Sequence, residues 1–365
     1  MLQIRIQKKF QEIMSFKSNF TCLNCSLLLS FMLLLQTATG QYNFSEVDKI
    51  IAAGKQSLGG KLVTIVAKDG KVVYKNEVGE DFKMETPIPI GTSSKWLTAA
   101  LVMTFVDKKE LSLDDPVSKY LPMFGSYSKS YITIRHCLAE ITGIEAEQKK
   151  VTRLLQKKKF SSLEEEVNYY ASHKDIITQP GKEFFYGDVG YNTLGRVLEV
   201  VAKKKTFSKL MQERITKLAG MKKTSFLNDR GSEDPASGAV STAGDYIRFM
   251  TMLLNDGMAN GKQVLSKESI EEMEKVGFSG LPVKSAPKAA QGFKYALGVC
   301  VQEADKNGKS TVISCPGVEG AWPYLDRCRK YACIILTPQR DTEQNQNVFL
   351  QMKEEIEKQF KSDCN

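Results

Sequence analysis

The sequence predicts an α+β fold, in which an antiparallel β-sheet is flanked by helices and a helical lobe is inserted between its strands. Segments of β-rich alternation occur near both ends of the chain, over about residues 60–80 and 290–340. The middle of the chain, about 108–270, instead shows apolar residues at helical spacing. Strands from both ends must therefore meet in one sheet beside the helical segment. We expect residues 41–365 to form a single domain of this kind.

The first 40 residues differ from the rest of the chain. Four basic residues precede the apolar run SLLLSFMLLL, which is followed by the small residues of QTATG. This layout is typical of a secretory signal peptide that is cleaved near Gly40. An uncleaved membrane anchor is the alternative, but the apolar run is shorter than the roughly 20 residues that cross a bilayer. We therefore expect a secreted, extracellular or periplasmic protein without stable membrane insertion.

Individual elements can be predicted in order along the mature chain. Residues 45–56 indicate an amphipathic helix capped by Ser45, and two β-rich runs around Asp69-Gly70 indicate a hairpin. Residues 93–107 form an apolar helical stretch. Further helices are predicted over 162–173, 191–204, 207–220, 243–257 and 346–360, and further strands within 294–317 and 322–338.

Charge and composition exclude some classes of partner. The formal net charge is +9 and falls to +6 without residues 1–40. Lysine runs at 149, 157 and 203 are far apart and carry no interleaved aromatic residues, which favours solvated helix faces over a nucleic-acid site. We therefore expect a small-molecule or peptide substrate and no nucleic-acid partner. The oligomeric state is left open.

Cysteine and histidine content bears on redox chemistry and on the catalytic base. Two histidines and the lack of a Cys-x-x-Cys pair in the exported part disfavour a zinc site, and we expect no cofactor. Both histidines lie in segments typical of structural positions, so a base for acyl chemistry is not expected to be histidine. Disulfides are possible in an oxidising compartment, and two pairings across turns, Cys300 with Cys315 and Cys328 with Cys333, are hypotheses. The exported cysteines are Cys137, Cys300, Cys315, Cys328, Cys333 and Cys364.

The tetrapeptide TSSK at residues 92–95 opens the apolar helix. Positions three apart share one face of a helix, so Thr92 has the offset needed to work with Lys95, and its hydroxyl lies at the positive end of the helix. Ser93 and Ser94 point elsewhere and are expected to cap free amides. A hydroxyl one turn before a partly buried lysine is typical of acyl-enzymes in which the amine takes the hydroxyl proton.

The surrounding sequence makes this motif specific, although Ser-x-x-Lys spacing also occurs at 126–129 and 285–288. Over about residues 45–358 the chain resembles the serine β-lactamase and penicillin-binding-protein-like family, on its class C and D-alanyl-D-alanine carboxypeptidase side. The resemblance implies an antiparallel sheet of five or more strands, with the active site in a groove between sheet and helical lobe. It rests on the order and spacing of IPIGTSSKWLTAALVMTFVDKKELSLDDPVSKYLP, ITIRHCLAEITGI, PGKEFFYGDVGYNTLGRVLEVV, STAGDYIRFMTMLLNDG and WPYLDRCRKYACIILTP.

The resemblance implies roles for the first two motifs. The first falls on residues 92–95, where Thr92 replaces the family's nucleophilic serine and Lys95 is the proton acceptor. The second falls on residues 186–188, where Tyr186 is the phenolic acid/base and Asp188 stands in place of an amide. Threonine keeps the hydroxyl but adds a methyl that restricts its rotamers and crowds the tetrahedral intermediate.

The third motif departs further from the family. It falls on Cys315-Pro316-Gly317, where the cation or imidazole and the following hydroxyl are both absent. The family's oxyanion hole consists of backbone N–H groups, here those of Thr92 and Val318, and backbone donors survive side-chain replacement. A substrate carboxylate would lose its partner, which favours a neutral ester or amide substrate.

Two functions therefore follow from the sequence. The first is an exported hydrolase that works by acyl-enzyme chemistry through Thr92 on an ester or amide. The second is a catalytically impaired relative that binds a peptide or partner in the same groove. The fold cannot distinguish them, because function depends on the site.

Overall fold

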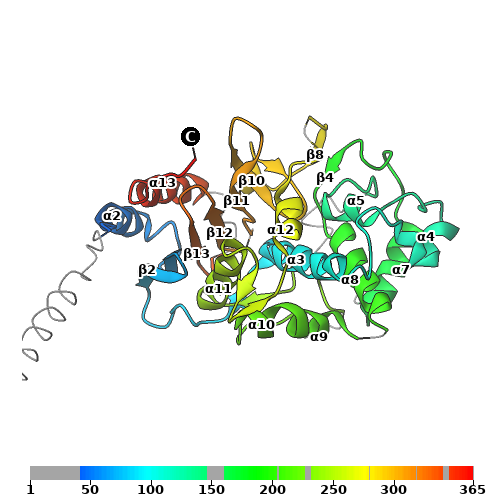
Figure 1. The fold of residues 1–365 in the computed structure, drawn as a ribbon, viewed down its shortest axis with the longest axis horizontal. Coiled ribbons are helices and arrows are strands. Elements are labelled where there is room, and N and C mark those ends of the chain that lie inside the picture. Colours follow the sequence, from blue (N-terminus) through cyan, green and yellow to red (C-terminus); the bar gives the residue numbers. More distant parts are fainter. Residues whose placement is uncertain are drawn as a thin grey trace, which may run out of the picture. The chain divides into compact units, whose positions relative to one another are not determined.

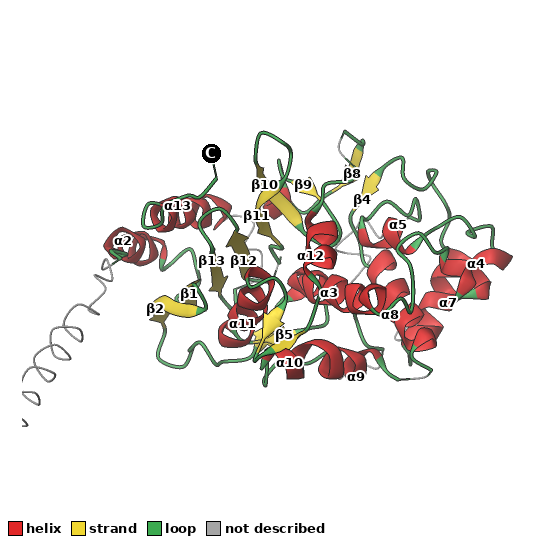
Figure 2. Ribbon diagram, viewed as in Figure 1, coloured by secondary structure: helices red, strands yellow, loops and turns green. Residues whose placement is uncertain are grey.

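The computed structural model has a seven-stranded antiparallel sheet as its main β-structure (Figure 2). Its strands are hydrogen-bonded in the order β2-β1-β13-β12-β11-β10-β9, so the N-terminal hairpin pairs with the last strand of the chain. The predicted α+β fold with an antiparallel sheet is confirmed. The strands are β1 (Leu62–Lys68), β2 (Lys71–Val78), β9 (Lys294–Tyr295), β10 (Cys300–Ala304), β11 (Ser310–Ser314), β12 (Ala321–Asp326) and β13 (Tyr331–Leu336).

Not every residue of the chain is described by the structure. From Phe44 onward the chain forms one compact unit. The predicted signal peptide, residues 1–40, and the predicted oxyanion residue Val318 lie outside the described residues. The described ranges are 42–145, 160–203, 205–226, 232–278, 280–317, 319–339 and 345–364.

Helices cover both faces of the sheet (Figure 1). Side chains alternate along the paired strands β1 and β13, so Ile65 and Ile334 face one buried cluster while Val66 and Cys333 face the other. Helices α2 and α13 cover the second cluster, and α11 packs against β1 and β13 from the first. Burial on both faces explains why these strands are continuously apolar. The bounds are α2 (Ser45–Gly54), α11 (Ala243–Leu254) and α13 (Gln346–Glu357).

The helical part of the chain is organised around α3. Twelve of its fourteen residues are buried, so even its polar side chains lie in the interior. None of the described helices is long and apolar enough to cross a membrane. The remaining helices are α3 (Ser94–Asp107), α4 (Pro122–Ser126), α5 (Ile134–Leu138), α7 (Leu163–His173), α8 (Val189–Val201), α9 (Phe207–Met211), α10 (Lys217–Ala219) and α12 (Lys267–Glu274).

Two local predictions near the N-terminus have different outcomes. The hairpin turn between β1 and β2 is confirmed: Asp69 has φ 50 and Gly70 has φ 75, the left-handed pair that a two-residue hairpin turn requires. The prediction that Ser45 caps α2 is wrong. The N-cap is Phe44, which makes no side-chain cap and whose ring packs 4.6 Å from the ring of Tyr74.

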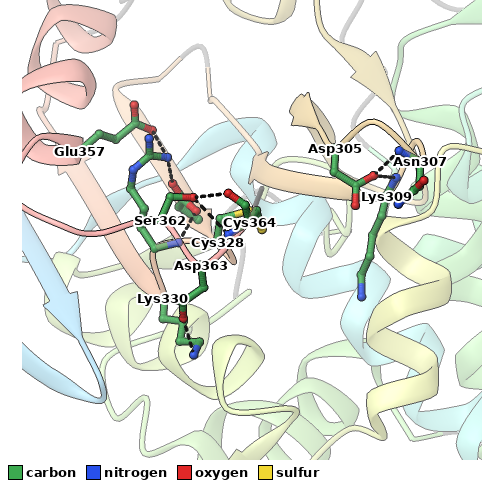
Figure 3. The surroundings of a disulfide bond; sticks show 11 residues. Asp305, Asn307, Lys309, Cys328, Lys330, Glu357, Ser362, Asp363 and Cys364 are labelled. Atoms are coloured by element: carbon green, nitrogen blue, oxygen red, sulfur yellow. Dashed lines mark hydrogen bonds and ion pairs between the residues drawn. A yellow bond between two sulfur atoms is a disulfide. The ribbon is translucent and has the colours of Figure 1, made fainter.

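The cysteine pairing differs from both sequence hypotheses (Figure 3). The sulfur atoms of Cys328 and Cys364 lie 1.97 Å apart, at disulfide distance. Cys333 is a free, buried thiol on β13, and Cys300 and Cys315 are also free and buried. The C-terminal segment lies beside the turn after β12, where Asp363 N–H donates to the Cys328 carbonyl at 2.8 Å. Spacing along the chain could not reveal this contact, because Cys364 reaches the turn only after α13 has packed.

This arrangement predicts a definite thiol count. The mature protein, denatured without reductant, is expected to show four titratable thiols, and six after reduction. The measurement is a thiol titration under denaturing conditions. Two thiols before reduction would mean that a second pair, such as Cys300 with Cys315, had formed. Six would mean that Cys328 and Cys364 are not joined.

Candidate active site

Thr92 lies on a tight turn that leads into α3. The turn is a 3-10 helix, η1 (Gly91–Ser93), and Thr92 is 8% exposed. Gly91 has φ 52, and a Cβ built on it would lie 3.0 Å from Glu319 Oε2, so the turn needs glycine for both conformation and space. The Thr92 hydroxyl donates to the Pro316 carbonyl at 3.4 Å. The predicted nucleophile therefore faces the segment that follows β11.

The two serines after Thr92 do not cap α3, so this prediction is wrong. Ser93 Oγ donates to the Cys315 carbonyl at 2.6 Å. Ser94 Oγ donates to the Gly91 carbonyl at 2.6 Å and accepts from the Ala239 N–H at 3.0 Å. Buried backbone groups need hydrogen-bond partners, and these hydroxyls supply them. Both serines thus join the start of the helix to other segments.

The Lys95 ammonium is fully buried and has three partners. It forms an ion pair with the Glu140 carboxylate and donates to the Gly187 carbonyl at 2.7 Å. Its nitrogen also lies 3.4 Å from the centroid of the Tyr186 ring. No hydrogen bond between described residues joins Lys95 to the hydroxyl of Thr92. Lys95 thus contacts the ring of Tyr186 rather than the hydroxyl of the predicted nucleophile.

Glu140 is a site residue that the sequence analysis missed. It follows α5, its side chain is 2% exposed, and its Oε2 accepts from the Gly187 N–H at 3.2 Å. Burial raises the pKa of Glu140 to about 7, and the attraction of Lys95 opposes that shift. One signal was available: a single glutamate inside the apolar stretch 138–141 is unusual, because buried carboxylates are rare without a partner.

Tyr186 lies beside Lys95, where the resemblance placed it. It follows β4 (Phe184–Phe185), which pairs with β8 (Val283–Ser285) in a small parallel sheet, and its N–H donates to the Ser285 carbonyl at 3.1 Å. Burial raises the pKa of the Tyr186 phenol well above its usual range, and a side-chain hydrogen bond with Thr92 is an opposing influence. The phenol is therefore protonated at neutral pH.

Asp188 occupies the N-cap of α8, two residues after Tyr186. Its backbone carbonyl accepts from the Asn192 N–H at 2.9 Å, and the Ser237 hydroxyl donates to its carboxylate at 3.4 Å. Its charge contributes to the raised pKa of Glu140, although less than burial does. The structure thus places all three residues of the second motif around the end of Lys95 and its carboxylate partner.

The third motif also lies against the first. Cys315 Sγ is 3.5 Å from the Thr92 carbonyl oxygen. A Cβ built on Gly317 would lie 2.5 Å from the Ile90 carbonyl oxygen, so glycine allows this close approach. Gly317 N–H donates to the Ala321 carbonyl at 2.7 Å. Its neighbour Val318 lies outside the described residues, so the pair of backbone donors stays a prediction.

The other candidates from the sequence have structural roles. In the tetrapeptide at 126–129, Lys129 is buried and donates to the Ala171 carbonyl at 2.8 Å. His136 Nδ1 accepts from the Thr133 N–H at 3.3 Å in a capping box at the start of α5, and burial lowers the pKa of this imidazole. No group of His, Cys, Asp or Glu in the described part of the chain could hold a metal ion.

The sheet and the site together define a member of the Beta-lactamase family, whose family model matches residues 47–351 of the chain. The family resemblance stated from the sequence is therefore confirmed. The fold is the serine-hydrolase fold of that family, and hydrolases are among its members.

Similar proteins span most of the chain. Protein Rv1367c of Mycobacterium tuberculosis is 24% identical over 334 residues, which cover 72% of this chain and 82% of that protein. The D-alanyl-D-alanine-carboxypeptidase/endopeptidase AmpH of Escherichia coli is 22% identical over 263 residues, which cover 66% of this chain and 67% of AmpH. A Bacteroides dorei protein assigned as a β-lactamase has a crystal structure that superposes with a TM-score of 0.74 at 27% identity, covering 82% of this chain and 92% of that chain.

Proposed function

We propose that this chain is an exported, slow acyl-transferring hydrolase in which Thr92 is the nucleophile. One observation carries the proposal: the Tyr186 phenol, whose pKa the Thr92 hydroxyl lowers against the effect of burial, carries the buried Lys95 ammonium on the face of its ring. A nucleophile, a proton acceptor and a group that stabilises the acceptor's negative form are thus adjacent. Export rests on the pattern of residues 1–40.

The chemistry takes two steps. In the ionised form of Tyr186, Thr92 Oγ bonds to the carbonyl carbon of the substrate while its proton passes to the Tyr186 phenolate, and the carbonyl electron pair moves to the oxygen. The bond to the leaving group then breaks as that group takes the proton, and water hydrolyses the acyl-enzyme by the same route. Burial disfavours the Tyr186 phenolate, whereas the Lys95 charge on its ring favours it. Because these effects oppose one another, we expect a slow reaction.

The charges around the site favour a substrate without a carboxylate. Glu140 neutralises Lys95, and no cation stands in the third motif. Two further carboxylates lie nearby: Asp188 follows the second motif, and Glu319 packs against the glycine before Thr92. A negative site repels an anionic substrate. We therefore propose a small-molecule or peptide substrate with a neutral or cationic ester or amide, although AmpH is named for carboxypeptidase activity.

The test is burst kinetics with three matched p-nitrophenyl esters whose acyl groups are anionic, neutral or cationic. We expect up to one equivalent of p-nitrophenol per chain in the burst and slower turnover, with the anionic ester the poorest substrate. The variant Thr92→Val keeps the side-chain shape without the hydroxyl and is expected to lose at least about 10³-fold in acylation rate. Ser126→Ala, which alters the exposed serine of the other Ser-x-x-Lys tetrapeptide at the end of α4, serves as the matched control. Equal hydrolysis by the parent and Thr92→Val would overturn the proposal.

A second function is favoured by the number of partners that the Lys95 ammonium already has. Its ammonium already has a carboxylate, a carbonyl and a ring face as partners, so little capacity remains for proton transfer. In this alternative the groove binds a peptide or partner protein without turnover. The same experiment separates the two functions, because the binding alternative predicts no burst with any ester. It also predicts that a ligand bound in the groove competes with a fluorophosphonate and slows its reaction with the Thr92→Ser variant.

A further inference from the structure

We propose that Glu140 is a positioning residue for acyl transfer, which acts through Lys95 by holding its amine against Tyr186 and by fixing the backbone of the second motif. This inference rests on the proposed function of Thr92. Nothing in the sequence motifs of the site assigns a role to Glu140.

The two oxygens of the Glu140 carboxylate have different partners. Oε1 binds the Lys95 ammonium on α3, and Oε2 accepts from the Gly187 N–H at 3.2 Å. Gly187 returns the contact, because its carbonyl accepts from Lys95 at 2.7 Å. The three groups form a closed ring of hydrogen bonds between the first and second motifs. One carboxylate therefore sets the distance between the amine and the peptide unit that follows Tyr186.

The backbone around Glu140 is shaped for this task. Glu140 has φ 58, a left-handed conformation that is unfavourable for a residue with a Cβ and is retained where the surroundings require it. Its carbonyl accepts from the Phe185 N–H at 2.8 Å, which pins the strand before Tyr186 to the end of α5. The main chain and the side chain of Glu140 thus both bind the segment around Tyr186, through the N–H groups of Phe185 and Gly187.

Protonation of Glu140 should weaken this arrangement. Burial raises the pKa of Glu140 to about 7, so below that pH the Lys95 ammonium loses its charged partner. The groups that face the carboxylate cannot replace that charge: the nearby phenols and thiols have pKa values raised by burial, and Asp188 is an acid that itself raises the pKa of Glu140. Besides Lys95 and Asp188, the titratable groups around Glu140 are the phenols of Tyr186, Tyr191 and Tyr295 and the thiols of Cys137, Cys300 and Cys315.

The experiment measures the rate of fluorophosphonate labelling at Thr92 between pH 5.5 and 8.5. In this reaction the threonine oxygen bonds to phosphorus, fluoride leaves and the hydroxyl proton is released. We expect the parent rate to fall as the pH is lowered through about 7. At pH 8 we expect Glu140→Gln to label about ten- to hundredfold more slowly and to lose that inflection, as for residues that orient a functional group. Glu166→Gln is the control, because Glu166 is a half-buried carboxylate with a raised pKa but bonds neutral donors.

Each outcome decides the inference. Labelling of Glu140→Gln at the parent rate, with the parent pH profile, would overturn the role of Glu140 and leave Thr92 as the nucleophile. If the parent is not labelled, the same comparison is made between Thr92→Ser and Thr92→Ser with Glu140→Gln. A slower double variant would support the positioning role, and equal rates would overturn it. Absence of labelling in Thr92→Ser as well would overturn both the inference and the proposed function.

Discussion

Replacing both members of the buried ion pair, Lys95→Met together with Glu140→Gln, is expected to stabilise the fold by about 1–4 kcal/mol at pH 8, while it abolishes acylation. Both side chains are at most 2% exposed, so removing them from water costs more than their mutual attraction returns. Urea unfolding of the parent and the double variant measures the difference. A pair that lowers stability is retained for another reason, and here we expect that reason to be catalysis.

The pH dependence of this effect has a definite sign. The pKa of Glu140 rises from its ordinary 4.5 to about 7 in the fold. Between pH 4.5 and 7 Glu140 binds its proton more tightly in the folded protein than in the unfolded chain. Protonation of Glu140 therefore stabilises the parent fold; this contribution to the free energy of unfolding is fully present below pH 4.5 and is lost as the pH rises through 7. The advantage of the double variant should therefore shrink as the pH falls from 8 to 4.5.

An exposed ion pair supplies the control. Lys49 and Glu46 on α2 are 72% and 57% exposed, and Lys49→Met with Glu46→Gln should leave the free energy of unfolding unchanged within the error of the measurement. If the buried double variant were instead less stable than the parent by several kcal/mol, the Lys95–Glu140 ion pair would stabilise the fold. The expectation that the pair lowers stability and is retained for catalysis would then be wrong.

Thr92→Ser is expected to raise the rate of acylation by about ten- to hundredfold. Serine keeps the hydroxyl and removes the methyl, which in threonine restricts the rotamer and crowds the tetrahedral intermediate. That gain corresponds to about 1.4–2.8 kcal/mol of barrier. The burst phase of an activated ester measures it for the parent and the variant under the same conditions. An equal or lower rate for serine would show that the methyl is not what limits the reaction.

The parts of the fold that short-range patterns control could be predicted from the sequence. Asp69-Gly70 identified the first hairpin, because few other residue pairs adopt two consecutive left-handed conformations. The apolar stretch over 93–107 indicated a helix, and α3 is that helix. The position of β13 between β1 and β12 could not be predicted without the family resemblance, because it depends on contacts across more than 250 residues.

The site was predictable where spacing along one element decides geometry, and not where distant segments meet. Thr92 and Lys95 share a turn of chain, so their closeness followed from the sequence, whereas the partners of the Lys95 ammonium did not. Glu140, itself in a left-handed conformation, reaches Lys95 from the end of a separate helix; its apolar surroundings in the sequence indicated burial but did not identify Lys95 as the partner. Cys364 similarly meets Cys328 only through packing of the C-terminal segment. In both cases the partner lies in a segment that is remote in sequence.

The most direct test of the account is intact-mass spectrometry of the protein after exposure to a fluorophosphonate and to activated esters, followed by peptide mapping. The account predicts a single adduct on Thr92 of the parent that is absent from Thr92→Val. An unmodified parent beside a labelled Thr92→Ser variant would contradict it, because the groove would then be intact while threonine is no nucleophile.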